Sequence, residues 1–321
     1  MRLRSLLVDV GVLGVAGLAL SVPATGHAAS SVSRAPTVHQ LSVKAAHPAR
    51  PRKSSNLYYH GGVGGVGVET GRDQVYLVYW GSQWTNNDPS GEIGIQQSFF
   101  GAVGASSWNN SVTQYCEGVA SGTITCPATA THASNPSGVL GGTWSDSTGA
   151  APSSPTQSQL AAEAVRAAAH FGNTSAGSNT TAQYVISTAT GNNSNGFGTQ
   201  YCAWHSSTSS SYGNIAYTNM PYITDAGASC GANFVNSGST GLTDGITIVG
   251  GHEFAETETD IFPNGGWLDS GGKENGDKCA WISSGQGASA NVTLKSGTFA
   301  VQSLWSNAFN SGAGGCVLSY P

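Results

Sequence analysis

The feature that most constrains this chain is residues 251–256, Gly-His-Glu-Phe-Ala-Glu, which place a histidine and a glutamate four positions apart. On a helix, positions i and i+4 project from one face, so His252 and Glu256 can reach the same cation. Glu253 points about 100° away from His252 on such a helix. The spacing therefore predicts a helix that binds a divalent metal and keeps a free carboxylate beside it, as metal-assisted hydrolysis requires.

Acidic residues concentrate around this motif. From Ser54 onward the chain has 16 aspartates and glutamates, and eight of them lie between residues 244 and 277. We expect a helix from Thr243 to about Thr259, capped by Asp244 and ended by the Pro-Asn-Gly-Gly stretch at 263–266. The alternative is an acidic helix that faces solvent and binds no ion.

A third metal ligand has to come from outside the His-Glu-x-x-Glu motif. Glu274 and Asp277 follow a Gly-rich turn and can fold back over the ion, and Glu274 is the favoured choice. Asp260 is a further candidate at the helix end, whereas Asp269 is expected to be a turn residue or to support a ligand. Glu256 stands where the more familiar motif has a second histidine. This oxygen ligand leaves zinc as the expected ion and gives weight to calcium or manganese.

The first 55 residues have the composition of export and leader segments. Arg2 and Arg4 precede an apolar run at 6–20, and small residues at 26–28 predict cleavage after Ala28, so residues 1–28 are interpreted as a signal peptide. The run is too short for a membrane anchor and is interrupted by Asp9. Residues 29–55 are rich in Ser, Pro, Ala and basic side chains, which predicts a flexible leader or pro-segment outside the fold. The mature protein is expected to be secreted.

From Ser54 onward, 16 acidic and 5 basic residues give a net charge of −11, which disfavours binding to nucleic acid or to anionic membranes. Six cysteines in an exported chain predict disulfides, and six allow 15 pairings. We expect the local set, Cys116–Cys126, Cys202–Cys230 and Cys279–Cys316.

The remaining residues, 56–321, are predicted to form one α/β (α+β) domain of zincin-like layout: a mixed sheet, a backing helix and a metal-site helix, braced by disulfides and rich in loops. Residues 74–80 are β-branched and aromatic and predict a buried strand. Helices are expected at 92–103 and 158–171, further strands at 183–187, 214–217 and 316–318, and a hairpin at 291–305 that turns at 296–297.

Several segments together resemble the EXORDIUM or phosphate-induced-protein family of extracellular proteins. The matching segments span most of the mature chain in the family's order; they are residues 59–62, 76–84, 201–205, 244–256, 266–267, 274–279 and 302–316. The resemblance implies an extracellular or wall-associated protein linked to growth responses. It maps the family's acidic motif onto His252, Glu253 and Glu256 and its later acids onto Glu274 and Asp277, and it favours Glu274 as the third ligand.

The same resemblance draws attention to His205, which lies in the Cys-Ala-Trp-His segment at 202–205. His205 is a candidate for a metal ligand or for a group that stabilises an oxyanion. The alternative is a histidine that packs beside the Cys202 disulfide.

Two other patterns are discounted. The glycines at 62–67 match a dinucleotide fingerprint only formally, because no helix follows them. Residues 227–231 match a nucleophile elbow, but no strand leads into them and Cys230 is expected to be crosslinked. Exposed aromatic residues could line a carbohydrate groove, although core packing explains eight tryptophans equally well.

The sequence thus predicts a secreted, monomeric, metal-dependent peptidase that acts on protein or peptide substrates. His252, Glu256 and Glu274, with Asp277 next, would hold zinc or, alternatively, calcium; Glu253 would be the general base, with His205 as a second catalytic candidate. The rival is a non-catalytic extracellular or cell-wall-associated protein with a structural calcium site, which binds cell-wall glycan or a receptor.

Overall fold

The apolar run predicted from the sequence forms one of the inner strands of the main sheet. In the computed structural model, which describes residues 37–44 and 56–320, it forms β3 (Gln74–Trp80). Successive strand residues point to opposite faces. Val75, Leu77 and Tyr79 accordingly enter the main apolar core on one face, while Val78 packs into a second core on the other. Both faces of the sheet are therefore covered.

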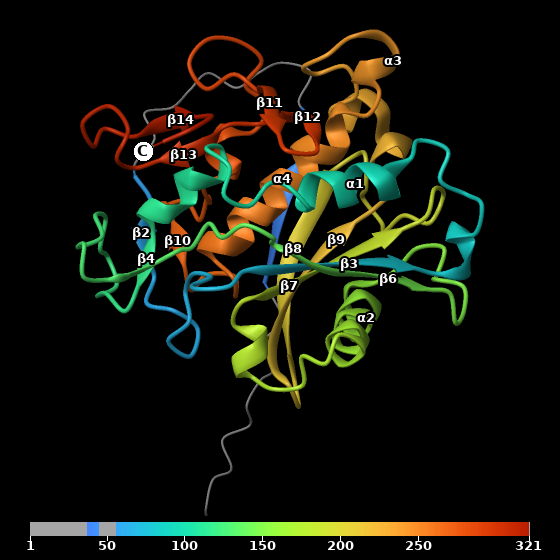
Figure 1. Cartoon of the computed structure of the whole chain (residues 1–321), viewed down its shortest axis with the longest axis horizontal. Helices are drawn as coiled ribbons and strands as arrows, with labels where there is room; N and C mark the ends of the chain where they lie inside the picture. Colours follow the sequence, from blue (N-terminus) through green and yellow to red (C-terminus); the bar gives the residue numbers. More distant parts are fainter. Residues whose placement is uncertain (1–36, 45–55, 321) are drawn as a thin grey trace, which may run out of the picture. The chain divides into compact units, whose positions relative to one another are not determined.

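Six strands form this mixed sheet in the order β1-β8-β9-β7-β3-β6 (Figure 1). β6, β3, β7 and β9 run parallel to one another, β8 runs antiparallel to β9, and β1 runs antiparallel to β8. The strands added to β3 are β1 (Val38–Ser42), β6 (Leu140–Asp146), β7 (Ala182–Thr188), β8 (Tyr201–Ser210) and β9 (Gly213–Met220).

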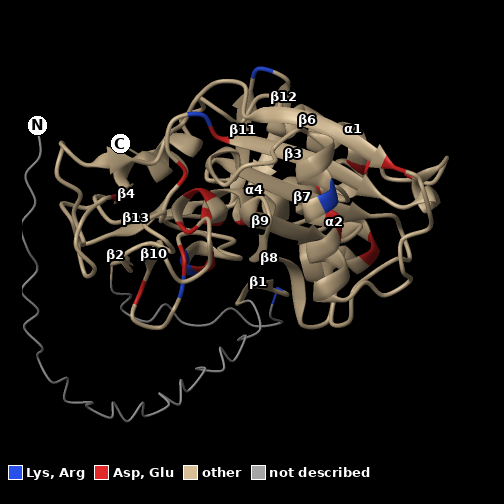
Figure 2. Ribbon diagram, turned by 90° about the horizontal axis from the view of Figure 1, so that it is seen from below, with Lys and Arg blue, Asp and Glu red and all other residues tan. Residues whose placement is uncertain are grey.

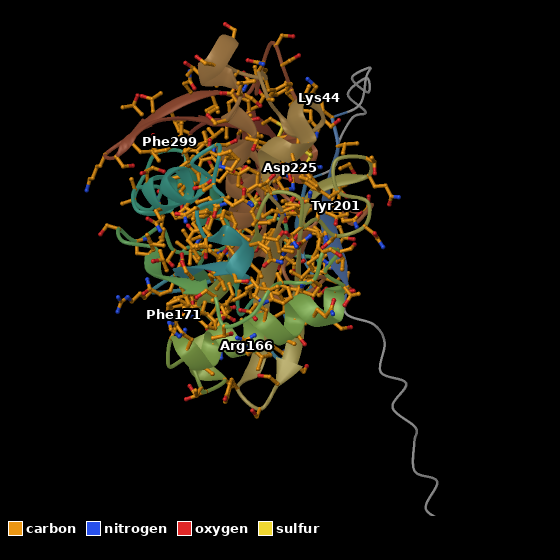
Figure 3. All side chains as sticks on the ribbon, turned by 90° about the vertical axis from the view of Figure 1, so that its right-hand side faces the viewer. Lys44, Arg166, Phe171, Tyr201, Asp225 and Phe299 are labelled. Atoms are coloured by element: carbon orange, nitrogen blue, oxygen red, sulfur yellow. A yellow bond between two sulfur atoms is a disulfide. The ribbon has the colours of Figure 1, made fainter. Side chains whose placement is uncertain are left out.

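Helices cover both faces of the sheet. α2 (Gln157–His170) packs on one face, while α1 (Glu92–Phe100) and α4 (Asp244–Thr259) pack on the other (Figure 1). In Figure 3, Arg166 of α2 and the following Phe171 lie on the opposite side of the protein from Phe299. A capping box between Thr156 and Gln159 starts α2, which explains why a Ser/Thr-rich segment precedes it.

Shorter elements complete the fold. Four two-stranded sheets pair β10 with β2, β11 with β12, β13 with β14 and β4 with β5. Their bounds are β2 (Tyr58–Tyr59), β4 (Cys116–Glu117), β5 (Thr131–His132), β10 (Trp267–Leu268), β11 (Ala290–Leu294), β12 (Gly297–Val301), β13 (Leu304–Ser306) and β14 (Gly315–Val317). The short helices are η1 (Ser82–Trp84), η2 (Asn109–Gln114), η3 (Gly177–Asn179), η4 (Ile223–Cys230), α3 (Gly238–Gly241) and η5 (Asp277–Cys279).

The α/β fold class and the disulfide pairing predicted from the sequence are confirmed. The three disulfides join Cys116 to Cys126, Cys202 to Cys230 and Cys279 to Cys316, with Cα separations of 5.4 to 6.0 Å. The last two join β8 to η4 and η5 to β14, and so hold together segments around α4.

Two details differ from the sequence expectations. Thr243 occupies the N-cap of α4, and Asp244 is instead the first helical residue. The Asp244 carboxylate accepts hydrogen bonds from the main-chain N–H groups of Val235 and Asn236, so it fixes the preceding loop. The sequence expectations also included no strand at 201–210, where the structure has the ten-residue β8.

The larger departure concerns residues 37–44, which the sequence analysis placed in a flexible leader. Val38–Ser42 form the edge strand β1 instead, and Leu41 is fully buried in the main core. The burial alternates along the strand, with His39 and Leu41 inside and Gln40 and Ser42 outside. The sequence itself does not alternate, because its two apolar residues, Val38 and Leu41, fall on opposite faces of the strand. The expected signal peptide, residues 1–28, lies outside the described residues.

Charged side chains are sparse over much of the described chain, and acidic ones recur on α4 and the loops near it (Figure 2). Among the residues that the structure describes, none of the helices combines the length and the apolar character needed to cross a bilayer.

Three carboxyl groups are buried together beside α4, away from the His-Glu-x-x-Glu motif. Glu69, Asp73 and Glu258 are each 0 % exposed. Burial raises the pKa of Asp73 to about 7, and burial followed by repulsion from Asp73 raises the pKa of Glu69 and Glu258 well above the ordinary value. An amide N–H of Asn109 donates to Glu258 at 2.8 Å, a contact that a neutral carboxyl also accepts. The group is therefore most stable when protonated.

Glu258→Gln tests this account of the buried acids. The pKa of Glu258 is raised in the folded state, so ionisation costs stability progressively as pH rises above the unfolded value near 4.5. The glutamine variant does not pay this cost. The difference in free energy of unfolding between the variant and wild type should therefore shift in favour of the variant by about 1 kcal/mol or more from pH 5 to pH 8. Urea unfolding at the two pH values measures the difference. An equal loss of stability at both pH values would contradict the account.

Candidate metal centre

Helix α4 is enclosed by the protein on all sides. Each of its 16 residues is buried, and it contacts β8, β12, α1 and η4. The alternative of a solvent-facing acidic helix is therefore wrong. A buried helix can keep ionisable side chains only where partners or a cation compensate their charge. His252, Glu253 and Glu256 are 0 to 1 % exposed, so the compensation has to come from neighbouring groups.

His252 and Glu256 face each other as the helical spacing predicts. The Nε2 atom of His252 lies 3.0 Å from Oε1 of Glu256, but the contact lacks hydrogen-bond geometry and Nε2 has no hydrogen-bond partner. The other ring nitrogen, Nδ1, lies 3.1 Å from Oε1 of Gln302. Gln302 in turn donates to the Gly276 carbonyl at 2.8 Å. A metal-binding histidine is commonly oriented in this way, with one nitrogen held by an oxygen acceptor and the other free for the ion.

Glu256 presents its two oxygens to different neighbours. Oε1 accepts the main-chain N–H of Asp277 at 2.7 Å and contacts His252. Oε2 has no hydrogen-bond partner and lies 3.6 Å from Nε2 of His205. Two imidazoles thus approach opposite oxygens of one buried carboxylate. This geometry suits ligands that share a cation as well as ionic pairs between protonated histidines and the carboxylate.

His205 enters the cluster from β8, four strand positions after Tyr201 and next to α4. Its Nε2 atom lies 3.0 Å from Oε2 of Glu274, and its Nδ1 atom lies 3.5 Å from the Thr257 hydroxyl. Thr257 donates its hydroxyl proton to the Glu253 carbonyl at 2.7 Å, which leaves its oxygen free to accept from His205. Both nitrogens of His205 are therefore directed at groups within the cluster.

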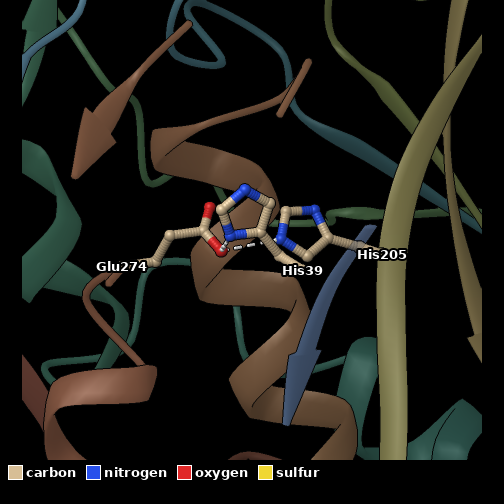
Figure 4. Close-up of side chains that lie close together, drawn as sticks. All are labelled: His39, His205 and Glu274. Atoms are coloured by element: carbon tan, nitrogen blue, oxygen red, sulfur yellow. Dashed lines mark hydrogen bonds and ion pairs between the residues drawn. The ribbon is translucent and has the colours of Figure 1, made fainter. Parts of the chain in front are cut away.

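Glu274 is the point at which three chain segments meet (Figure 4). Its Oε2 atom contacts His205 from β8 and, at 2.9 Å, Nδ1 of His39 from β1, while its Oε1 atom has no hydrogen-bond partner. Sequence reasoning missed His39 because it assigned the whole leader to a region outside the fold. No apolar alternation pointed to His39, because the buried face of β1 combines His39 with Leu41 while the apolar Val38 lies on the other face.

Glu253 differs from every other acid in the cluster. It is 1 % exposed, and neither of its carboxylate oxygens has a hydrogen-bond partner. Burial raises the pKa of Glu253 to about 8, against the attraction of His252. A carboxylate with such a pKa can take up a proton near neutral pH.

Three overlapping groups of side chains have ligand atoms within 4.8 Å of one another, close enough to hold a metal ion. They are His252, Glu256 and Asp277; His205, Glu253 and Glu256; and His39, His205 and Glu274. The structure thus brings together all six site residues predicted from the sequence and adds His39. Glu274, the favoured third ligand, groups with His205 and His39. Asp277 groups instead with His252 and Glu256, the α4 pair.

The other acids near α4 have structural roles. Asp260 accepts main-chain N–H groups of Asn264, Gly265 and Gly266 and so fixes the turn after the helix. Asp269 accepts main-chain N–H groups within its own turn and pairs with Lys278 at 3.0 Å, in agreement with its expected turn role.

The charges of the cluster are strongly interdependent. Burial lowers the pKa of each histidine, but neighbouring carboxylates outweigh it: Glu274 raises the pKa of His39 to about 10 and that of His205 to about 9, and Glu256 raises that of His252 to about 10. Burial raises the pKa of Glu274, yet His205 and His39 together hold it well below its usual range. Without a metal, protonated histidines therefore neutralise the buried carboxylates.

Comparison with family models, with curated proteins and with solved structures finds no match for this chain. The resemblance to the EXORDIUM family and the zincin-like interpretation therefore stay predictions.

Gly276→Ala tests whether the environment of the α4 pair controls metal binding. An added Cβ would lie 2.8 Å from Nδ1 of His252 and 2.9 Å from Oε1 of Glu256, so both side chains would have to shift. We expect the affinity for zinc to fall by about tenfold or more, as it does when residues that orient metal ligands are changed. Gly94→Ala in α1 is the matched control, because its Cβ meets no atom within 4 Å. Competition with a chromophoric chelator measures both affinities, and equal values would refute the assignment.

Metal affinity should also depend on pH. The pKa of His252 is raised to about 10, so a metal has to displace its proton at neutral pH. Below that pKa the apparent affinity rises with pH by about tenfold per unit for each displaced proton. Titrations between pH 6 and pH 8 should therefore show at least this slope. An affinity that does not change over this range would contradict proton displacement.

Proposed function

We propose that this protein is a metal-dependent peptidase in which His205, His252, Glu256 and Glu274 hold one divalent ion and Glu253 is the general base. The observation that carries the proposal is the position of Glu253 among the donor groups. Its oxygens are free of hydrogen bonds, and it shares a ligand-distance group with His205 and Glu256. A free carboxylate beside a set of metal ligands is the arrangement needed for metal-assisted hydrolysis.

The donor atoms are of kinds that bind cations, and they form three overlapping groups. Buried atoms without hydrogen-bond partners include Nε2 of His252, Oε2 of Glu256 and Oε1 of Glu274, which are the kinds of atoms that bind metals. The Nδ1 atoms of His252 and His205 are each directed at an oxygen acceptor, which leaves the Nε2 atoms for an ion. The Asp277 main-chain N–H orients Glu256 at the same time.

Zinc is the ion that this donor set favours. Zinc binds mixtures of imidazole nitrogen and carboxylate oxygen, whereas calcium takes six to eight oxygen ligands. Two imidazoles, those of His205 and His252, among the four proposed ligands therefore favour zinc over calcium. A bound divalent ion supplies Lewis acidity and lowers the pKa of water at the site.

The residues around the ion have separate chemical roles. Glu253 would accept a proton from water, since its pKa of about 8 lies close to neutral pH, and would then pass it to the leaving amine. Without an ion, Nε2 of His205 holds Glu274 in place through its 3.0 Å contact, and a bound ion would replace that contact. The complete burial of these groups excludes bulk water, which strengthens their mutual electrostatic interactions.

The proposed setting is extracellular, and the proposed substrates are proteins or peptides. The three disulfides suit an oxidising compartment, which supports export without demonstrating it. The export signal predicted at residues 1–28 is consistent with that setting.

Glu253→Gln is the decisive variant, because it keeps the shape of the side chain and removes its basicity. We expect the purified variant to bind zinc with wild-type stoichiometry and to cleave a peptide library at least about 100-fold more slowly than wild type. Glu163→Gln in α2, a buried acid on the other face of the sheet, is the matched control and should leave cleavage unchanged. Mass spectrometry of the library and elemental analysis give the two readouts. Wild-type cleavage by Glu253→Gln would refute the general-base role.

One observation favours the rival function, a structural metal in a non-catalytic extracellular protein. The side chains that would hold the ion are closed off from solvent, with His205, His252, Glu256 and Glu274 at 0 to 1 % exposure. In that case chelation would lower the melting temperature, because the ion binds only the folded state, and no peptide would be cleaved under any condition.

A further inference from the structure

Strand β1 is attached to the sheet in the way that an added peptide would be. It pairs antiparallel with β8 at the sheet edge, and the Lys44 N–H donates to the Ser229 carbonyl at 2.9 Å just beyond the strand. None of the three disulfides involves residues 37–44. Extended peptides bind exposed sheet edges through the same main-chain pairing, with alternate side chains filling pockets. Here those inward side chains are His39 and Leu41.

His39 reaches directly into the proposed active site. It is the register partner of His205 across the two strands, so both imidazoles lie on the same face of the sheet (Figure 4). Their nitrogens contact the same oxygen of Glu274, at 2.9 Å for His39 and 3.0 Å for His205. The other nitrogen of His39, Nε2, is buried and has no hydrogen-bond partner. His39 therefore competes for the carboxylate that the proposed metal site requires.

His39 is also more exposed than the groups around it. Its side chain is 9 % exposed, whereas His205, Glu253 and Glu274 are 0 to 1 % exposed. A peptidase has to admit an extended substrate to its general base, and β1 contacts α4, which carries that base. With β1 in place, the edge of β8 beside His205 is occupied along its length from residue 201 to residue 206.

The sequence after β1 offers a way to detach it. Residues 45–55 connect β1 to the rest of the domain and contain Arg50, Arg52 and Lys53 within four positions. A protease specific for basic residues would recognise these side chains. After a cut there, β1 would be held only by noncovalent contacts.

We propose that residues 37–44 are an internal blocking strand: β1 occupies the edge of β8 that binds extended peptide substrates, and His39 seals the site through Glu274. This inference rests on the proposed peptidase function. Release of β1 opens the edge to a peptide that takes its place, with one side chain facing Glu274 and an apolar side chain two positions later in the space of Leu41.

The test uses the full chain with a recognition sequence for a specific protease in place of residues 47–53. The probe is a fluorescent peptide of residues 36–44, and fluorescence anisotropy measures its binding before and after the cut. We expect no binding to the intact protein and saturable binding to the cut protein after its own strand has been removed by gel filtration. The probe with His39→Ala should bind at least about tenfold more weakly, because it lacks the contact with Glu274. The probe with Gln40→Ala, whose side chain faces solvent, should bind like the parent.

The outcomes separate this inference from the proposed function. If the cut protein unfolds without its strand, as circular dichroism would show, or if the His39→Ala probe binds as well as the parent, the blocking strand is refuted. If the probes behave as expected but neither form cleaves any peptide in the presence of zinc, the blocking strand stands and the peptidase function fails. If the intact and cut proteins cleave substrates at equal rates, the peptidase function stands and the block is refuted.

Discussion

The rest of the structure depends on the burial of ionisable groups around α4. A helix with all 16 residues inside the protein carries His252, Glu253 and Glu256 into a region where unpaired charge is very costly. The fold meets this constraint by bringing His205, Glu274 and His39 to the same place from distant segments. The resulting cluster is balanced either by protonated histidines or by a metal ion. These two states are mutually exclusive at His252, which links metal binding to proton release.

The surrounding scaffold explains how distant segments are kept in register. The Cys202–Cys230 disulfide ties β8 to η4 three residues before His205, and the Cys279–Cys316 disulfide fixes the segment just after Asp277. Gln302, which follows β12, orients His252 and holds the Gly276 carbonyl. The two disulfides and Gln302 thus hold the segments that carry the cluster. On the side of His39, the cluster is covered by β1, which no disulfide joins to the rest of the domain.

Local patterns made much of this architecture predictable. Helical spacing correctly paired His252 with Glu256, and the shortest cysteine pairing proved to be the real one. Long-range contacts were harder, since no local pattern shows that Glu274 meets His205 and His39 while Asp277 meets Glu256. His39 was missed because composition dominated the interpretation of the leader, and the apolar residues of the five-residue strand do not alternate. The burial of α4 was also not foreseen, because an acidic segment usually faces solvent.

The central claim is that the buried cluster binds a divalent metal, and elemental analysis of protein purified without chelators tests it most directly. The account predicts close to one zinc per chain in the wild-type protein and a loss of most of that zinc in the double variant His252→Ala, Glu256→Gln, with the wild-type circular dichroism spectrum retained. A wild-type protein that contains no stoichiometric metal, and whose affinity for added zinc equals that of the double variant, would contradict it.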